Sequence, residues 1–121
     1  MTIHVLPQAL TVCKVDKLSE IDLSRPLYFI AKTDEELSVV CETEHAPIKA
    51  IAREDGWRGF RIEGTLDFSL VGILSKLSGL LASVGIGLFA VSTFNTDYIL
   101  VKRENLEHAL KLLSENGYDI E

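Results

Sequence analysis

The chain has 121 residues, which allows one domain of ordinary size or two very small modules that share one core. Its hydrophobic fraction of 47% and charged fraction of 25% are near globular averages and exclude disordered, collagen-like and coiled-coil proteins. Twelve Lys and Arg against eighteen Asp and Glu give a net charge of −6, and no basic run exceeds two residues, so we expect no nucleic-acid partner.

The first half predicts three strands and one short helix. Residues 10–15 suit a strand, and residues 27–32 and 37–42 suit the two strands of a hairpin joined by an acidic turn. Pro47 fits the first position of a helix, and the apolar residues after it predict a short helix over 47–52.

The second half predicts strand, helix, strand, strand, helix and strand, which is the ferredoxin-like order. Apolar residues at helical spacing indicate both helices, and Gly85 suits the left-handed position after the first of them. The expected elements are a strand at 57–63, a helix over 73–84, strands at 88–93 and 98–102, a helix over 106–113 and a last strand from Tyr118.

An uncharged stretch over residues 77–94 has the length of a membrane span. Three glycines interrupt it and its apolar period changes near Gly85, so we interpret it as helix, turn and buried strand and expect no membrane partner. The first five residues lack the features of a secretory signal. Cys13 and Cys41 suit a reduced apolar core, and we expect a cytoplasmic protein.

The two halves share a pattern when the hairpin over 27–42 is shifted by 61 positions. The apolar positions then coincide, and Asp34 aligns with Asn95. Short hairpins also resemble one another by chance, so the pattern leaves that alternative open. We interpret it as two βαββα units with antiparallel sheets and helices on one face, of the α+β class: a reduced first unit at 1–55 and a second at 56–121.

No constellation of residues indicates catalysis. The G-x-G-x-x-A match at 85–90 follows a helix and precedes a strand, the reverse of the order that a dinucleotide needs. The three histidines, His4, His45 and His108, are scattered in polar surroundings, and we interpret each as a surface residue. We therefore expect no enzyme, no cofactor and no metal site.

Two segments could hold a small zwitterion. The connector at 67–73 precedes a helix whose free N–H groups and dipole suit a carboxylate, and Gly72 allows close approach. The turn at 93–97 offers hydroxyl, amide and carboxylate groups that suit an ammonium group. Spacing alone favours an ordinary capped helix and a plain hairpin turn, so both alternatives stay open.

The helix over 73–84 also has a face of small residues, with Ser75, Gly79 and Ser83 at every fourth position. A solvated helix face usually carries Lys and Glu, so we expect this one to pack against another helix, in a homodimer or between units. A monomer at micromolar concentration in light scattering would contradict this expectation.

Several blocks of the sequence together resemble a known family. The blocks are DGWRGFRIEG at 55–64, LDFSLVGIL at 66–74, GI at 85–86, STFNTDYILV at 92–101 and, in the first half, residues 27–41. In this order and spacing they resemble ACT-domain proteins of the bacterial type that is related to the animal cytosolic arginine sensors. The resemblance covers roughly residues 10–115.

The resemblance implies tandem ACT units that bind a small ligand, usually an amino acid, where ACT units meet. In the arginine sensors the ligand contacts come from the loop before the helix and from the turn between the second and third strands. The matching residues here are Ser69, Leu70, Val71, Gly72 and Ile73, with Thr93, Phe94, Asn95, Thr96 and Asp97.

One departure bears on the ligand. The arginine sensor has a carboxylate where this chain has Leu70, and the loss of a charged partner for a guanidinium costs a few kcal/mol. We expect a smaller or more apolar amino acid and a non-catalytic regulatory module. The alternative function is a protein-interaction module that docks a partner enzyme or transporter without a small ligand.

Overall fold

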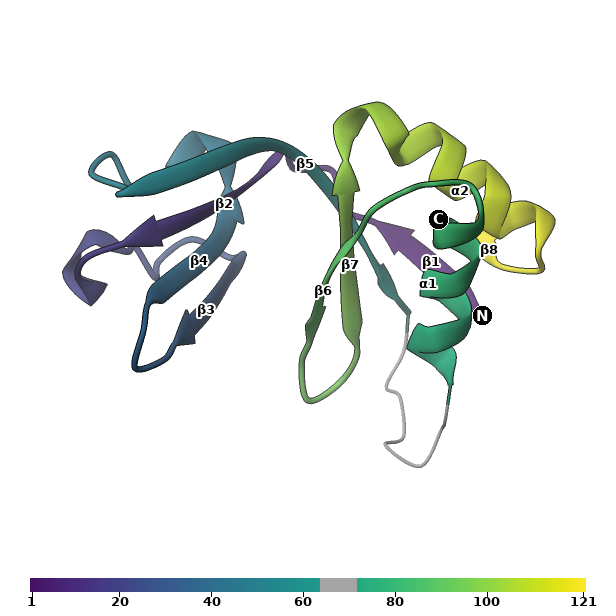
Figure 1. Cartoon of the computed structure of the whole chain (residues 1–121), viewed down its shortest axis with the longest axis horizontal. Helices are drawn as coiled ribbons and strands as arrows, with labels where there is room; N and C mark the ends of the chain where they lie inside the picture. The colour runs from purple at the N-terminus through teal and green to yellow at the C-terminus, as the bar shows by residue number, and fades with distance from the viewer. Residues whose placement is uncertain (64–71) are drawn as a thin grey trace. The chain divides into compact units, whose positions relative to one another are not determined.

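The structure, a computed structural model, describes residues 1–63 and 72–121. They belong to two compact units (Figure 1). The small unit is Gln8–Trp57, and the helical unit combines Met1–Pro7 with Arg58–Glu121. Residues 1–7 thus belong with the second unit, although we expected them in the first. No helix in the described ranges has the length and apolar character needed to cross a membrane.

The small unit is an antiparallel sheet whose strand order is β3-β4-β2-β5. Its strands are β2 (Leu10–Val15), β3 (Tyr28–Lys32), β4 (Leu37–Glu42) and the first part of β5 (Ala52–Ile62). These strands confirm the three predicted in the first half. The connections carry only single 3₁₀ turns, η1 (Leu18–Glu20) and η2 (Thr43–His45).

The helix predicted over 47–52 is wrong. Residues 47–51 form a turn, and Ala52 already begins β5. The physical reason lies in the Ile51 N–H, which donates to the carbonyl oxygen of Lys14 at 2.7 Å. This bond attaches the segment to the sheet edge, so the chain extends along β2 instead of closing helical turns. β5 consequently begins well before the strand expected at 57–63.

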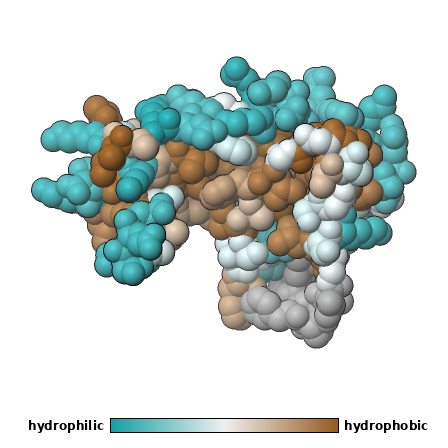
Figure 2. All heavy atoms as spheres, in the orientation of Figure 1, coloured by the Kyte–Doolittle hydropathy of each residue, from teal (hydrophilic) through white to brown (hydrophobic). Residues whose placement is uncertain are grey.

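The core of the small unit contains both cysteines, which are free and buried as expected. Burial, and then the neighbouring Cys13 thiol, raises the pKa of Cys41 to about 12, so this thiol stays protonated. Brown apolar side chains still reach the surface of this unit in Figure 2. The exposed large apolar residues of the unit are Leu18, Leu23, Ile30, Ile48 and Ile51.

A buried hydroxyl ties β2 to β5 within the small unit. Thr11 is fully buried, and its Oγ1 donates to Asp55 Oδ1 at 2.7 Å and lies 2.9 Å from Thr43 Oγ1. Asp55 also accepts from Arg53 Nε at 2.8 Å. The Thr11 hydroxyl, and then the Arg53 guanidinium, hold the pKa of the Asp55 carboxyl below its ordinary value of 3.8.

This arrangement predicts a pH-dependent contribution to stability. A carboxyl whose pKa is lower in the folded chain stabilises the fold above its unfolded pKa, and that contribution is lost as the pH falls through the folded pKa. We expect the difference in free energy of unfolding between the wild type and Thr11→Val to be constant from pH 7 to pH 5 and to shrink below about pH 4. Solvent screening of the half-exposed Asp55 keeps the effect small. Urea unfolding across this range measures it, and an equal difference at pH 3 and pH 6 would contradict it.

The helical unit confirms the predicted order of strand, helix, strand, strand, helix and strand. After the second part of β5 come α1 (Ile73–Ser83), β6 (Phe89–Ser92), β7 (Asp97–Lys102), the turn η3 (Arg103–Asn105), α2 (Leu106–Glu115) and β8 (Asp119–Ile120). The strand order is β6-β7-β5-β1-β8. The unpredicted strand β1 (Thr2–Val5) lies between β5 and β8, antiparallel to β5 and parallel to β8.

Both helices pack on the same face of this sheet (Figure 1). Leu77 and Leu81 of α1 and Leu113 of α2 are fully buried against Phe60 of β5. Gly85 has a φ of +74°, which confirms the left-handed position predicted after α1. The burial of these leucines at helical spacing is what holds the helices to the sheet.

The two hairpins correspond at an offset of 60 residues, and the predicted shift of 61 is wrong. Phe29 pairs with Val40 in the first hairpin, and Phe89 pairs with Leu100 in the second. The offset of 60 superposes the buried residues 39–41 of β4 on the buried residues 99–101 of β7 and matches the cross-strand pairs of the two hairpins.

The turns of the two hairpins also share their hydrogen bonds. The Thr33 N–H donates to the Glu36 carbonyl at 2.9 Å, and the Thr93 N–H donates to the Thr96 carbonyl at 2.8 Å. In each turn the threonine hydroxyl accepts the N–H three residues later, at 3.2 and 3.3 Å. These shared details support the proposal of an internal repeat.

Candidate functional site

The predicted ligand residues that the structure describes lie at the end of the helical-unit sheet where β5 finishes and β7 starts. Thr96 is 8% exposed, and its Oγ1 donates to the carbonyl oxygen of Ile62 at 2.7 Å. This bond joins the last residue of β5 to the residue before β7. The turn between β6 and β7 and the end of β5 therefore lie at the same end of the sheet (Figure 1).

The turn at 93–96 uses some of its polar groups for its own structure. The Thr93 hydroxyl donates to the Thr96 carbonyl at 2.9 Å and accepts the Thr96 N–H at 3.3 Å. Asp97 Oδ1 accepts the Ser92 hydroxyl at 2.7 Å. Asn95 and Phe94 are exposed, Phe94 to 81%. The turn thus presents an amide, an aromatic ring and a half-buried carboxylate at one place.

The connector before α1 is described only in part. Ser69, Leu70 and Val71 lie outside the described residues. Gly72 has a φ of +83°, precedes the first turn of α1 and is exposed, and Ile73 begins the helix. The left-handed conformation at Gly72 suits glycine above other residues, so a side chain here would strain the backbone.

A cavity of about 230 Å³ adjoins the start of α1. Ile73 and Lys76 line it from the helix, and Met1 and residues 116–118 line it from the other side. Lys76 brings a positive charge to this cavity, while the turn at 93–97 does not contribute to its lining. Of the predicted ligand residues that the structure describes, only Ile73 borders it.

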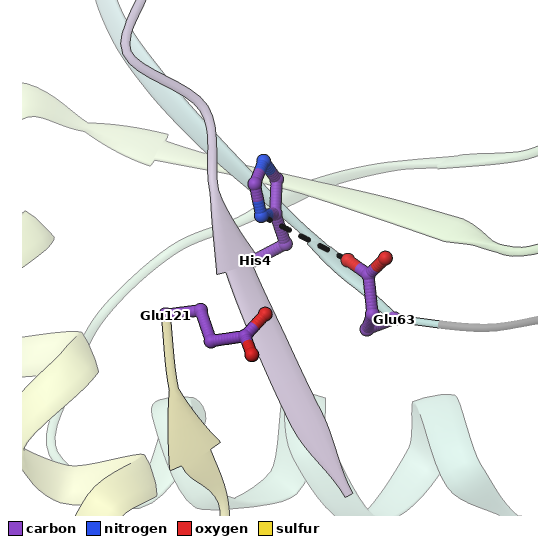
Figure 3. A group of neighbouring side chains, drawn as sticks. All are labelled: His4, Glu63 and Glu121. Carbon is purple, nitrogen blue, oxygen red and sulfur yellow. Dashed lines mark ion pairs between the residues drawn. The ribbon is translucent and has the colours of Figure 1, made fainter.

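A second group of polar side chains was not predicted. His4, Glu63 and Glu121 come together on the sheet of the helical unit (Figure 3). No motif spacing indicates them, because each follows or belongs to a different strand. Only a correct prediction of the strand pairing could have identified the group. That prediction would have to place residue 4 beside residues 61 and 121.

These observations define a small α+β domain with a ferredoxin-like helical unit. Residues 52–115 match the ACT domain, which is more than half of the chain, and the chain belongs to the ACT-domain family. ACT domains are small-molecule-binding regulatory modules that often oligomerise. The relation to the animal arginine sensors and the division into two ACT units stay predictions.

Three solved structures similar to this chain cover between 94% and 99% of it. Protein Atu0741 from Agobacterium tumefaciens is 28% identical, with a TM-score of 0.87 over 99% of this chain and 91% of that one. VC0802 from Vibrio cholerae, described as a possible transport protein, is 24% identical, with a TM-score of 0.74 over 94% and 88%. Aspartokinase alpha and beta subunits share the fold at 15% identity, with a TM-score of 0.68 over 95% and 96%. No functionally curated protein matches the sequence.

Proposed function

We propose that the chain is a non-catalytic regulatory module that binds an amino acid where ACT units meet. The observation that carries the proposal is the hydrogen bond from Thr96 Oγ1 to the Ile62 carbonyl, which holds the turn before Asp97 at the end of β5. The proposed site combines two segments, this turn and the start of α1. Membership of the ACT family supports a regulatory role, and an aspartate kinase regulatory domain shares the fold.

The chemistry of the two segments suits the two charges of an amino acid. N–H groups at the start of an α-helix have no partner within the helix and, with the helix dipole, attract a carboxylate. Gly72 leaves their approach open on the side that the structure describes, since no heavy atom of a described residue other than its chain neighbours lies within 4 Å of where its Cβ would be. At the other segment, Asp97 already accepts the Ser92 hydroxyl, and a carboxylate accepts several hydrogen bonds, so it can also receive an ammonium group.

The proposal includes a homodimer in which α1 contributes to the subunit contact. Ser75, Gly79 and Ser83 are all exposed on α1 of this chain, so the face of small residues is open to a partner helix. The ligand is proposed to be smaller or more apolar than arginine because Leu70 replaces a carboxylate of the arginine sensors. Light scattering with and without ligand gives the oligomeric state.

A thermal-shift screen against the free amino acids tests the proposal. A ligand at 100 times its dissociation constant stabilises the fold by about 2.7 kcal/mol, which raises the midpoint by several degrees. We expect Asp97→Asn and Gly72→Asp to abolish the shift that the wild type shows. Asp97→Asn keeps an acceptor for Ser92 and removes the charge, whereas Gly72→Asp adds a negative charge where the carboxylate binds.

Glu104→Ala is the matched control, because it removes an exposed carboxylate in η3, which follows the end of β7 opposite to the turn at 93–97. It should leave the shift unchanged. If both site variants kept the wild-type shift, the proposed site would be wrong even though the chain binds the ligand.

A protein-interaction module is the second candidate. The observation that favours it is the set of exposed apolar side chains in the small unit. The strands of this unit are connected by short 3₁₀ turns, whereas α-helices connect the corresponding strands of the helical unit. Leu23 and Ile48 are 69% and 99% exposed. A screen without any shift at millimolar amino acid would favour this function.

A further inference from the structure

The outer face of the helical-unit sheet carries a histidine between two glutamates (Figure 3). Ile3 pairs with Ile62 of β5 and with Ile120 of β8, and both Ile3 and Ile62 are buried in the core under the helices. Side chains alternate along a strand, so His4 points away from that core. His4 therefore lies on the sheet face that the helices leave open.

Strand register brings the three side chains together. His4 pairs with Arg61 on β5, and the parallel pairing of β1 with β8 continues from Ile120 to set Glu121 beside His4. Glu63 follows Arg61 by two residues and so shares its face. The grouping thus follows from backbone pairing and does not depend on one choice of side-chain rotamer.

The distances leave room for an ion among the three groups. One nitrogen of His4 and one oxygen of each glutamate lie within 4.8 Å of one another, and His4 Nδ1 is 3.8 Å from Glu63 Oε2. Two bonds of about 2.1 Å to one zinc ion span 3.8 Å at an angle of roughly 130°. A separation of up to 4.8 Å between two of the ligand atoms can shorten to this span when an exposed glutamate side chain rotates.

Glu63 approaches His4 and Arg61 at ion-pair distances that are longer than hydrogen bonds. Glu63 Oε2 is 3.8 Å from His4 and 3.5 Å from Arg61 Nε, and both distances exceed the usual 2.7–3.2 Å of a hydrogen bond. Arg61 is the competing cation, since it faces the same carboxylate. Its single positive charge is opposed by the negative charges of the two glutamates and of Asp119. Asp119 pairs with Thr2 and therefore lies on the same face of the sheet.

We propose that His4, Glu63 and Glu121 form a binding site for a divalent transition-metal ion of the zinc class. An imidazole with two carboxylates suits borderline ions such as Zn²⁺, whereas Mg²⁺ and Ca²⁺ prefer oxygen ligands alone. Three protein ligands leave a further position for water or for a donor from another molecule. The bound ion would join β1, the end of β5 and the short strand β8. This site shares no residue with the proposed amino-acid site and stands independently of it.

Isothermal titration of the metal-free protein with zinc chloride tests the site. We expect one equivalent of Zn²⁺ per chain, and at least tenfold weaker binding for His4→Gln and for Glu63→Gln, because each removes one ligand. His108→Gln is the matched control, since His108 is exposed on α2 and outside the group. It should bind like the wild type.

Circular dichroism of the two site variants shows whether each one folds, and both are expected to fold because the side chains are partly exposed. Wild-type protein that binds no Zn²⁺ at 100 µM would overturn the proposal. So would a folded His4→Gln that binds Zn²⁺ as tightly as the wild type.

Discussion

Replacing Leu81 by alanine is expected to lower the free energy of unfolding by about 2–5 kcal/mol. Leu81 is fully buried on α1 and belongs to the core formed by both helices and the sheet of the helical unit. Truncation removes apolar contacts and leaves a cavity that the surrounding side chains fill only in part. Urea unfolding followed by far-UV circular dichroism measures the change.

Leu23→Ala is the matched control for this prediction, because it deletes the same atoms from a leucine that is 69% exposed in the small unit. It should change the free energy of unfolding by about 0.5 kcal/mol or less. Equal effects of the two substitutions would show that α1 does not bury this face against the sheet.

The fold was predictable where hydrophobic periodicity extends over a whole element. The bounds of β2 and β4 agree with the sequence prediction, and α1 and α2 begin where their apolar stripes begin. Each of these elements buries one face, so the period of the buried residues identifies it. Gly85 could be predicted for a local reason, since only its own backbone conformation matters.

The failures come from contacts distant in the sequence. Pro47 and the isoleucines after it satisfy the local pattern of a helix, but the bond from the Ile51 N–H to Lys14 draws this segment onto the sheet. β1 is four residues long and is stabilised by pairing with β5, in the middle of the chain, and with β8, at its other end. Local propensity does not report either interaction.

The candidate sites show the same difference between features that are local in the sequence and features that depend on distant contacts. The polar turn at 93–97 is visible in the sequence because its residues are consecutive. Its place beside the end of β5 depends on the bond between Thr96 and Ile62, which are 34 residues apart. The group of His4, Glu63 and Glu121 needs two strand pairings to form, so scattered residues in the sequence become neighbours only in the sheet.

Thr96→Val is expected to lower the free energy of unfolding by about 1–3 kcal/mol, because it removes a buried hydrogen bond and leaves the Ile62 carbonyl without that donor. Valine has nearly the shape of threonine and its preference for extended backbone, so the lost hydroxyl accounts for the effect. Thr96→Ser restores the hydroxyl and should recover most of the stability. Chemical denaturation of the three proteins measures these differences.

The same pair of variants connects the fold to the proposed function. If the bond holds the turn at 93–97 at the same end of the sheet as the start of α1, Thr96→Val should also reduce the thermal shift given by the ligand, and Thr96→Ser should restore it. Asp97 keeps its bond to Ser92 in both variants, so the carboxylate itself is unchanged. Thr96→Val could instead lower the stability of the protein and still bind the ligand as tightly as the wild type does. In that case the hydrogen bond between Thr96 and Ile62 serves folding alone, and ligand binding does not depend on the position of the turn that this bond fixes.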